Sequence, residues 1–247
     1  MNAVVILAAG KGSRMGGEIP KPLIKLHGKE LVLHVLEAVH ESGISTAKPC
    51  VVVGNGKEMV TQLLGESCTY VTQEKLLGTG HAVLCALPYI PAQAESILVL
   101  YADQPYVSAA TMQVLVTTRA LEHAPLAMAT VSVPDFLEWR SAFEHFGRIQ
   151  RHNGKVSGVV EWKDATEAER ATTEVNPAYF VFDAQWLREI LPKIGNKNAQ
   201  SEYYLTDCVA RAAKEGKGIP TVVIDAKEAL GINTRAHLDV LEREFGN

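Results

Sequence analysis

Residues 4–23, "VVILAAGKGSRMGGEIPKPL", pass from an apolar run directly into a glycine-rich, basic segment. A strand followed by a glycine-rich turn places backbone N–H groups beyond the carboxyl end of a sheet, where open α/β folds bind ligands. Glycine lets that backbone approach a phosphate closely. The spacing Gly10-x-Gly12-x-x-x-Gly16 matches neither the dinucleotide pattern GxGxxG nor a P-loop. The charge favours a triphosphate ligand over a solvated surface loop, since the cationic residues are Lys11, Arg14, Lys21 and Lys25.

The composition of the whole chain excludes several classes of protein. Its 247 residues are 47% apolar and 21% charged, as in an ordinary soluble globular protein. The net charge of −4 argues against a nucleic-acid polymer as partner, because proteins that bind phosphate backbones usually carry a basic excess. No apolar run approaches the roughly 18 residues of a membrane span, and we expect no signal peptide after Met1. The 4 cysteines form no CxxC pair, so we expect free thiols in a cytoplasmic protein.

Apolar runs and helical patterns alternate through the first half of the chain. The apolar runs predict strands at 3–9, 50–54, 69–73, 97–103 and 126–133. The helical patterns between them lie near 31–42, 57–65, 79–87 and 108–122. Uninterrupted Val, Ile and Leu indicate strands buried on both faces, which is typical of a parallel sheet covered by helices. The sequence therefore predicts an α/β fold, a Rossmann-like doubly wound and mostly parallel sheet.

The pattern changes after residue 134. Two β-like runs flank Asn153-Gly154, the dipeptide most typical of a β-hairpin. We expect this antiparallel insertion, spanning about 134–183, to form a lid over the ligand end of the sheet. Further along, the sequence predicts a strand at 173–184, a helix at 205–216, a strand at 220–225 and a last helix at 233–245, capped by Asn233 or Thr234. No linker-like segment divides 1–247, so a single domain is expected.

The opening motif and several later ones resemble a known enzyme family. "LAAGKGSRM" followed by "PKPL" is typical of nucleotidyltransferases that join a sugar 1-phosphate to a nucleoside triphosphate. Further motifs follow in order: "TQEKLLGTGHAV" (72–83), "LVLYADQP" (98–105), "FGRIQRHNGKVSGVVEWKDAT" (146–166), "TEVN" (173–176), "NKNAQSEYYLTD" (196–207) and "GINTRAHL" (231–238). Together they resemble the uridyltransferase half of the bifunctional UDP-N-acetylglucosamine pyrophosphorylases. The hexapeptide-repeat acetyltransferase half of that family is absent from this sequence, so we expect nucleotidyl transfer alone, unless the sequence is part of a longer protein.

The resemblance implies a site for UTP in the first half of the chain. The residues implied for uracil and ribose are Ala8, Ala9, Gly10, Gln73, Gly78 and Thr79. Gln73 would hydrogen-bond the uracil edge, since an amide offers both a donor and an acceptor. Without its motif, Gln73 would be an ordinary solvated residue at a strand end. Arg14 and Lys21 would contact the triphosphate and stabilise the charge that builds as pyrophosphate leaves.

The resemblance also implies a Mg²⁺ site and a sugar site. Asp103 follows a buried strand and, with Asn233, would hold Mg²⁺, a cation that takes few protein oxygens and fills its shell with water and phosphate. A helix cap is the alternative role for either residue. The hexosamine would contact a glycine that leaves room for the ring and two side chains that suit hydroxyl and acetamido groups, namely Gly147, Glu161 and Asn176. Tyr101 and Tyr204 would line the same pocket or belong to the core.

Four positions depart from the family's pattern. Ala102 and Gln104 flank the metal aspartate where the family has glycine and a small apolar residue, and "DQP" is reminiscent of molybdenum-cofactor nucleotidyltransferases. Pro177-Ala178 replaces a Thr-Gly pair beside the sugar, and Pro177 removes a backbone donor there. The expected acceptor is N-acetylglucosamine 1-phosphate. Glucose 1-phosphate and an acceptor of the molybdenum-cofactor type remain alternatives.

The expected reaction is a direct in-line transfer between small-molecule substrates. A phosphate oxygen of the sugar 1-phosphate would attack the α-phosphorus of UTP, with no protein nucleophile, because positioning and electrostatics carry such transfers. A dinucleotide-binding oxidoreductase is disfavoured by the spacing and charge of the glycine segment. A non-catalytic sensor of the same fold is disfavoured because the expected catalytic side chains are all present, namely Arg14, Lys21, Asp103 and Asn233.

Overall fold

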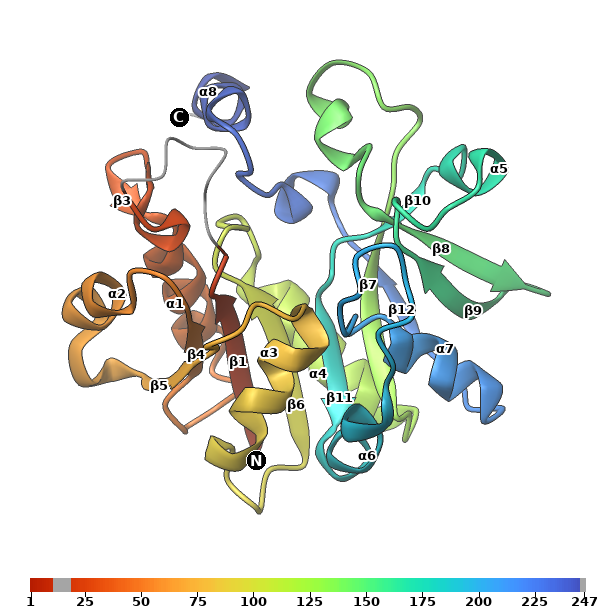
Figure 1. Cartoon of the computed structure of the whole chain (residues 1–247), viewed down its shortest axis with the longest axis horizontal. Helices are drawn as coiled ribbons and strands as arrows, with labels where there is room; N and C mark the ends of the chain where they lie inside the picture. The colour runs from red at the N-terminus through yellow and green to blue at the C-terminus, as the bar shows by residue number, and fades with distance from the viewer. Residues whose placement is uncertain (11–18, 245–247) are drawn as a thin grey trace.

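The computed structural model describes residues 1–10 and 19–244. Within them the central sheet has the strand order β5-β4-β1-β6-β11-β7-β10-β8-β9, and β12 pairs with β7 off this path. Figure 1 shows this sheet with helices on both sides. The strands of the sheet are β1 Asn2–Ala8, β4 Cys50–Val53, β5 Thr69–Thr72, β6 Ser96–Tyr101, β7 Leu126–Ser132, β8 Gly147–His152, β9 Lys155–Val160, β10 Glu174–Asn176, β11 Phe180–Asp183 and β12 Thr221–Val223. A separate short hairpin consists of β2 Lys25–Leu26 and β3 Lys29–Glu30.

The first half of the sheet is parallel, as the apolar runs predict. β5, β4, β1 and β6 pair in parallel in that order, and β11 then pairs antiparallel with both β6 and β7. The side chains of β1 are buried from residue 3 to residue 8, on both faces of the sheet. All five strands expected in this half are present within one or two residues of their expected ends. The fold prediction is therefore confirmed.

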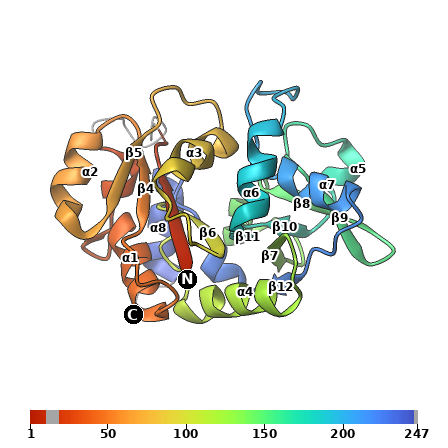
Figure 2. The same ribbon diagram turned by 90° about the horizontal axis from the view of Figure 1, so that it is seen from below.

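Helices cover both faces of the sheet. Buried residues of α1 and α4 join the core on one face, and those of α3, α6 and α7 join the core on the other. Figure 2 shows the sheet between these two layers. The four helices expected in the first half are present, and the full set is α1 Leu31–Ser42, α2 Lys57–Leu64, α3 Thr79–Ala86, α4 Ala109–Leu121, α5 Glu167–Arg170, α6 Ala184–Ile190, α7 Asp207–Lys214 and α8 Arg235–Glu244. None of these described helices is long and apolar enough to cross a membrane.

The expected hairpin is present, and the expected strand that follows it is interrupted. β8 and β9 are joined by Asn153 and Gly154, both with positive φ (50° and 77°), as a tight hairpin turn requires. The single strand expected at 173–184 is wrong, because the segment forms β10 and β11 with a break between them. Pro177 has no N–H for a ladder, and Ala178 adopts a left-handed conformation with φ 68°.

The C-terminal elements agree with the sequence pattern, and they show which of Asn233 and Thr234 caps the last helix. α7 is followed by Gly216 with φ 72°, the expected helix stop. The Thr234 hydroxyl accepts a hydrogen bond from the His237 N–H over 3.2 Å, so Thr234 caps α8. Asn233 is therefore available for another role. The expected end of this helix, residue 245, lies outside the described residues.

Candidate active site

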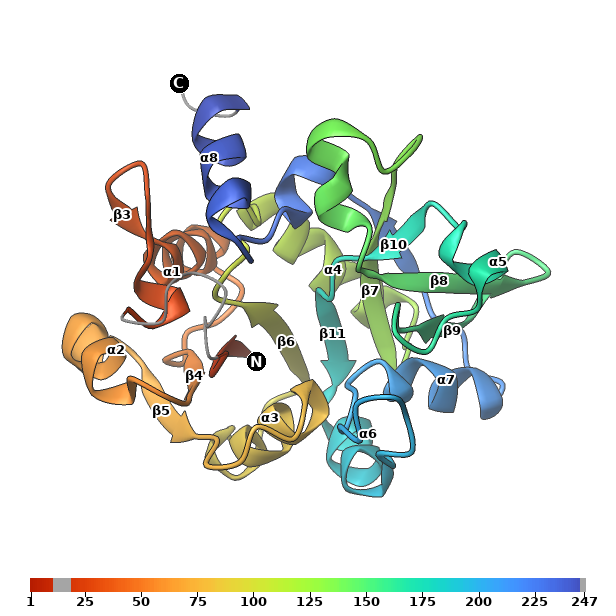
Figure 3. The same cartoon turned by 45° about the horizontal axis from the view of Figure 1, so that its top comes forward.

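The candidate site lies at the carboxyl ends of β1 and β6. These strands pair in parallel from Asn2 with Ser96 to Leu7 with Tyr101, so the segments that follow them lie side by side. The Ala102 N–H donates to the Leu7 carbonyl over 3.0 Å and keeps the two segments together beyond the strands. Figure 3 looks toward this edge and shows α3 and α8 on opposite sides of it. The edge is the one where open α/β folds bind ligands.

Lys21, Asp103 and Asn233 meet at this edge. The Lys21 ammonium forms an ion pair with Asp103 Oδ2 and donates a hydrogen bond to Asn233 Oδ1 over 2.7 Å. The Lys21 and Asp103 side chains are only 14% and 21% exposed, so the pair is partly shielded from water. The Ile232 N–H also donates to the Asp103 carbonyl over 3.0 Å, which holds the segment before α8 against the end of β6. Two side-chain oxygens thus converge on one cationic group.

A cavity of about 230 Å³ lies beside this cluster. Every residue that the resemblance implies for uracil and ribose lines it, namely Ala8, Ala9, Gly10, Gln73, Gly78 and Thr79. Lys21 and Asp103 line it as well. The structure therefore brings these predicted residues together in one cavity, which we call the nucleotide pocket. Arg14 lies outside the described residues.

Gln73 is buried in the wall of the nucleotide pocket, with 5% of its surface exposed. Its Nε2 donates to the Gly78 carbonyl and lies against Nδ1 of His81, each over 3.0 Å. In the part of the chain that the structure describes, Oε1 of Gln73 has no hydrogen-bond donor. Among the described residues, the protein therefore uses only the donor side of the amide.

Gly78 joins this loop to a distant segment. Its φ is 103°, and a Cβ atom at this position would lie 2.6 Å from the Tyr203 carbonyl oxygen. Three hydrogen bonds hold the segments together: Tyr203 N–H to the Leu77 carbonyl (2.8 Å), Gly80 N–H to the Tyr203 carbonyl (2.8 Å) and Leu205 N–H to the Thr79 hydroxyl (3.0 Å). Only glycine fits both the conformation and the close approach.

A second cavity, of about 270 Å³, contains the residues that the resemblance implies for the sugar. We call it the acceptor pocket, and its lining includes Gly147, Glu161, Asn176, Tyr204, Thr206 and Asn233. It shares Thr79, Tyr101, Asp103 and Glu202 with the nucleotide pocket. The two cavities therefore meet at Asp103.

Glu161 is the carboxylate of the acceptor pocket. Burial raises the pKa of Glu161, and a hydrogen bond from the Thr206 hydroxyl to Oε1, over 2.8 Å, opposes that shift. The pKa is raised further by the nearby carboxylates, of which Asp164 contributes most. Gly147 lies beside it, and a Cβ there would approach Val159 Cγ1 to 2.8 Å. Packing against Val159 thus requires this glycine even before a ligand enters.

Asn176 and Tyr101 complete the described pocket wall. Asn176 is 5% exposed, and its Oδ1 accepts a hydrogen bond from the Ala178 N–H over 2.9 Å. Asn176 pairs with Gly147 across β10 and β8, which fixes it beside the glycine. Burial raises the pKa of Tyr101 well above the ordinary value, and Glu161 raises it further, so the phenol stays neutral and can donate a hydrogen bond.

Sequence reasoning assigned no functional role to three residues of the site. Thr206 orients Glu161, His81 accepts from Gln73 and Glu202 lines both pockets. Each lies inside a quoted motif, in "GTGHA" or "SEYYLTD". The motifs contain them, but no local pattern identifies their contacts, and Thr206 lies 45 positions from its partner Glu161.

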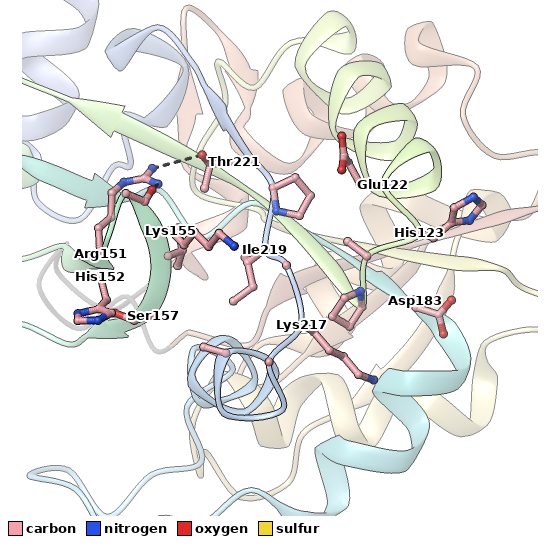
Figure 4. Close-up of a pocket in the computed structure, with 18 of the residues that line it drawn as sticks. Glu122, His123, Arg151, His152, Lys155, Ser157, Asp183, Lys217, Ile219 and Thr221 are labelled. Atoms are coloured by element: carbon pink, nitrogen blue, oxygen red, sulfur yellow. Dashed lines mark hydrogen bonds between the residues drawn. The ribbon is translucent and has the colours of Figure 1, made fainter.

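A larger groove of about 970 Å³ lies away from this site. Figure 4 shows Lys155, Lys217, Glu122 and Asp183 around it, and the Arg151 guanidinium donates there to the Thr221 hydroxyl over 3.3 Å. None of the site residues expected from the sequence lines this groove among the described residues. Its charges are mixed, so it does not resemble a phosphate site.

Comparisons with known proteins bear out the resemblance found in the motifs. The "Bifunctional protein GlmU" of Caldicellulosiruptor saccharolyticus is 39% identical over 98% of this chain and 51% of its own length, so the chain spans about half of that relative. Two solved structures share the fold at 17% identity. One, from Bacillus anthracis, is assigned as a glucose-1-phosphate thymidylyltransferase in complex with sucrose (TM-score 0.75, covering 97% of this chain and 93% of that one). The other is a UDP-glucose pyrophosphorylase with UDP-glucose (TM-score 0.73, covering 99% of each).

A family model covers most of the chain. The model that describes the MobA-like NTP transferase domain matches residues 4–201, which include most of β1, the glycine-rich segment and Asp103. The chain belongs to the family of MobA-like NTP transferase domains.

Proposed function

We propose that the protein transfers a uridylyl group from UTP to a sugar 1-phosphate and releases pyrophosphate. The observation that carries this proposal is the meeting of the nucleotide pocket and the acceptor pocket at Asp103. We further propose N-acetylglucosamine 1-phosphate as the acceptor, with support from the 39% identity to a GlmU protein. UDP-N-acetylglucosamine would be the product.

In the proposed reaction, an oxygen of the sugar 1-phosphate attacks the α-phosphorus of UTP. The new bond joins that oxygen to the α-phosphorus, and the bond to the bridging oxygen breaks, so the electron pair leaves with pyrophosphate. Lys21, together with Arg14, would stabilise the charge on the triphosphate. The Gln73 acceptor would take the N3–H of uracil, a group that cytosine lacks. On the acceptor side, Glu161 would bind sugar hydroxyls in an orientation set by Thr206.

Asp103 and Asn233 fit a Mg²⁺ ion. Their oxygens already converge on one cationic nitrogen, that of Lys21, and carboxylate and amide oxygens are suitable ligands for Mg²⁺. When bound, Mg²⁺ would neutralise negative charge on the phosphates. Lys21 would then be free to contact the triphosphate.

The remaining expectations from the sequence are part of the same proposal. Residues 1–247 would act as one nucleotidyltransferase domain, with 134–183 as the lid that supplies Gly147, Glu161 and Asn176 to the sugar. Free thiols at Cys50, Cys68, Cys85 and Cys208 are consistent with a cytoplasmic location, which we propose.

Pyrophosphate release tests the proposal. UTP, CTP and GTP would each be combined with N-acetylglucosamine 1-phosphate and glucose 1-phosphate, in the presence and absence of Mg²⁺. We expect the highest kcat/KM with UTP and N-acetylglucosamine 1-phosphate. Preference for glucose 1-phosphate would replace N-acetylglucosamine 1-phosphate as the proposed acceptor. Preference for GTP would favour an acceptor of the molybdenum-cofactor type. Binding of the substrates without turnover would indicate a sensor.

A further inference from the structure

Gln104 joins three segments of the site through one side-chain amide. It follows Asp103 directly and is 5% exposed. Its Nε2 donates to the Pro177 carbonyl over 2.9 Å and to the Ala229 carbonyl over 3.2 Å, positions that are 73 and 125 residues away in the sequence. One segment follows β6, the second is the turn between β10 and β11, and the third leads to Asn233.

The two segments that Gln104 reaches differ in their other attachments to the end of β6. The segment before Asn233 has other attachments, from the Ile232 N–H to the Asp103 carbonyl (3.0 Å) and from the Tyr179 hydroxyl to the Glu228 carbonyl (2.6 Å). The turn at 176–178 is closed within itself by the hydrogen bond from Ala178 to Asn176. Asn176 also pairs with Gly147 across β10 and β8, but neither contact attaches the turn to the end of β6. The contact from Gln104 to Pro177 does, so removing it should affect the turn first.

The turn at 176–178 adopts a conformation that its own residues do not favour. Ala178 has φ 68°, in the left-handed region that costs an alanine free energy and is adopted where the surroundings impose it. The turn also lines the acceptor pocket through Asn176, Pro177 and Ala178. A strained turn at a ligand pocket needs a fixed support, and the Gln104 amide provides one.

Packing alone does not explain a glutamine at position 104. Its Oε1 is buried and has no hydrogen-bond partner in the described part of the chain. Burying an unpaired polar atom is unfavourable, and an apolar side chain of the same length would avoid that cost. The two donated hydrogen bonds are the contacts that the amide makes within the described residues, and they distinguish glutamine from an apolar side chain there.

We propose that Gln104 is a positioning residue that fixes the turn at 176–178 over the acceptor pocket and thereby sets the enzyme's discrimination between acceptor sugars. The claim about acceptor sugars rests on the proposed transfer reaction, whereas the claim that Gln104 fixes the turn does not. Gln104 and Pro177 then belong to one structural unit, because the Gln104 amide donates directly to the Pro177 carbonyl.

The test is Gln104→Met, which keeps the length of the side chain and removes both donors. By hydrogen–deuterium exchange, the Ala178 amide should exchange at least about tenfold faster than in the parent. KM for the sugar 1-phosphate should rise about tenfold, KM for UTP should change less than about twofold, and the preference between N-acetylglucosamine and glucose 1-phosphates should fall. The melting temperature should stay the same or rise, because the unpaired Oε1 is also removed. If this variant does not fold, Gln104→Asn, one methylene too short, is measured in the same way.

Gln113→Met is the matched control, since Gln113 Nε2 also donates to a backbone carbonyl, that of Ser42 over 2.8 Å, away from both pockets. It should change neither the exchange at Ala178 nor either KM. Unchanged exchange and unchanged acceptor KM in Gln104→Met would overturn the proposal, as would equal rises in both KM values. A parent protein without transferase activity would refute the proposed function instead, and the exchange of Ala178 would still decide the role of Gln104 in the turn.

Discussion

Lys21 donates a hydrogen bond to Asn233 over 2.7 Å, although 212 positions separate the two residues in the sequence. The contact joins a 3-10 turn near the N-terminus, Lys21–Leu23, to the segment before α8. Asp103 lies against the same ammonium group. The first and last parts of the described chain therefore meet at the end of β6, and the cluster depends on the whole fold.

Asp103→Asn separates metal binding from a structural role. The substitution keeps the size of the side chain and deletes the one anionic ligand proposed for Mg²⁺. We expect turnover to fall roughly 10²–10³-fold, because a contact that stabilises the leaving pyrophosphate is lost. Excess Mg²⁺ should rescue the variant only in part. Pyrophosphate release at saturating substrates and a thermal melt are the measurements.

Asp225→Asn is the control for this experiment. Asp225 caps a 3-10 turn by accepting the Lys227 N–H over 2.8 Å, and asparagine caps almost as well, so activity should be unchanged. If Asp103→Asn kept turnover within about threefold of the parent, Asp103 would not be the electrostatic ligand proposed here.

Gln73 should make the enzyme prefer UTP to CTP. Both donor contacts of its amide nitrogen are made within the protein, to Gly78 and His81, so we expect only its acceptor to contact a base. Uracil offers an N3–H donor and cytosine offers a lone pair at that position. We expect kcat/KM to favour UTP by about 10²-fold or more at a fixed sugar phosphate. In Gln73→Met this ratio should shrink, and equal use of both nucleotides by the parent would show that Gln73 does not select the base.

The position of the site could be predicted from sequence, but its contacts could not. Buried apolar runs predicted β1 and β6, and parallel strands have their carboxyl ends at one edge of the sheet. Because Gly10 and Asp103 follow these strands, the sequence placed both residues at that edge. Asn233 has no such signal, and only the resemblance placed it at the site. Thr206 and Glu161 are 45 positions apart, and only the folded chain shows their hydrogen bond.

The turn at 176–178 shows what a local pattern leaves out. Pro177 inside the expected strand is itself a sign of an interruption, although the flanking β-branched and aromatic residues favour a strand. The positive φ of Ala178 has no signal in the sequence, because alanine does not favour it. The neighbouring contact from Gln104 to the Pro177 carbonyl is likewise visible only in the folded chain.

Glu161 should give acceptor binding a distinctive pH dependence. Burial raises its pKa above the ordinary value of 4.5, so the carboxylate becomes protonated at a higher pH than an exposed glutamate. KM for the sugar 1-phosphate should therefore rise as the pH falls through that raised pKa, and KM for UTP should change less. Stability has the opposite pH dependence, because ionisation of a carboxyl group with a raised pKa opposes folding, so its contribution to stability is lost as the pH rises.

Glu161→Gln is the control for this pH profile. The sugar phosphate titrates with a pKa of about 6 and affects both proteins alike, so the difference between their profiles belongs to Glu161. The variant should show a higher acceptor KM at neutral pH and a flatter profile. Glu161→Ala should raise the acceptor KM further, and an equal effect on UTP would place Glu161 outside the acceptor pocket.

Gly78→Ala should loosen the nucleotide pocket, because the new Cβ would lie 2.6 Å from a backbone atom, the Tyr203 carbonyl oxygen, at a residue whose φ is 103°. The segments 77–80 and 203–205 must then separate, and their hydrogen bonds weaken. We expect the free energy of unfolding to fall by about 1–3 kcal/mol and KM for UTP to rise more than KM for the acceptor. Gly43→Ala is the matched control, since Gly43 also has positive φ (60°) but open space around its Cβ position. It should show the conformational cost alone, with both KM values unchanged. If the two variants lost equal stability and Gly78→Ala bound UTP normally, close contact with Tyr203 would not be what shapes the pocket.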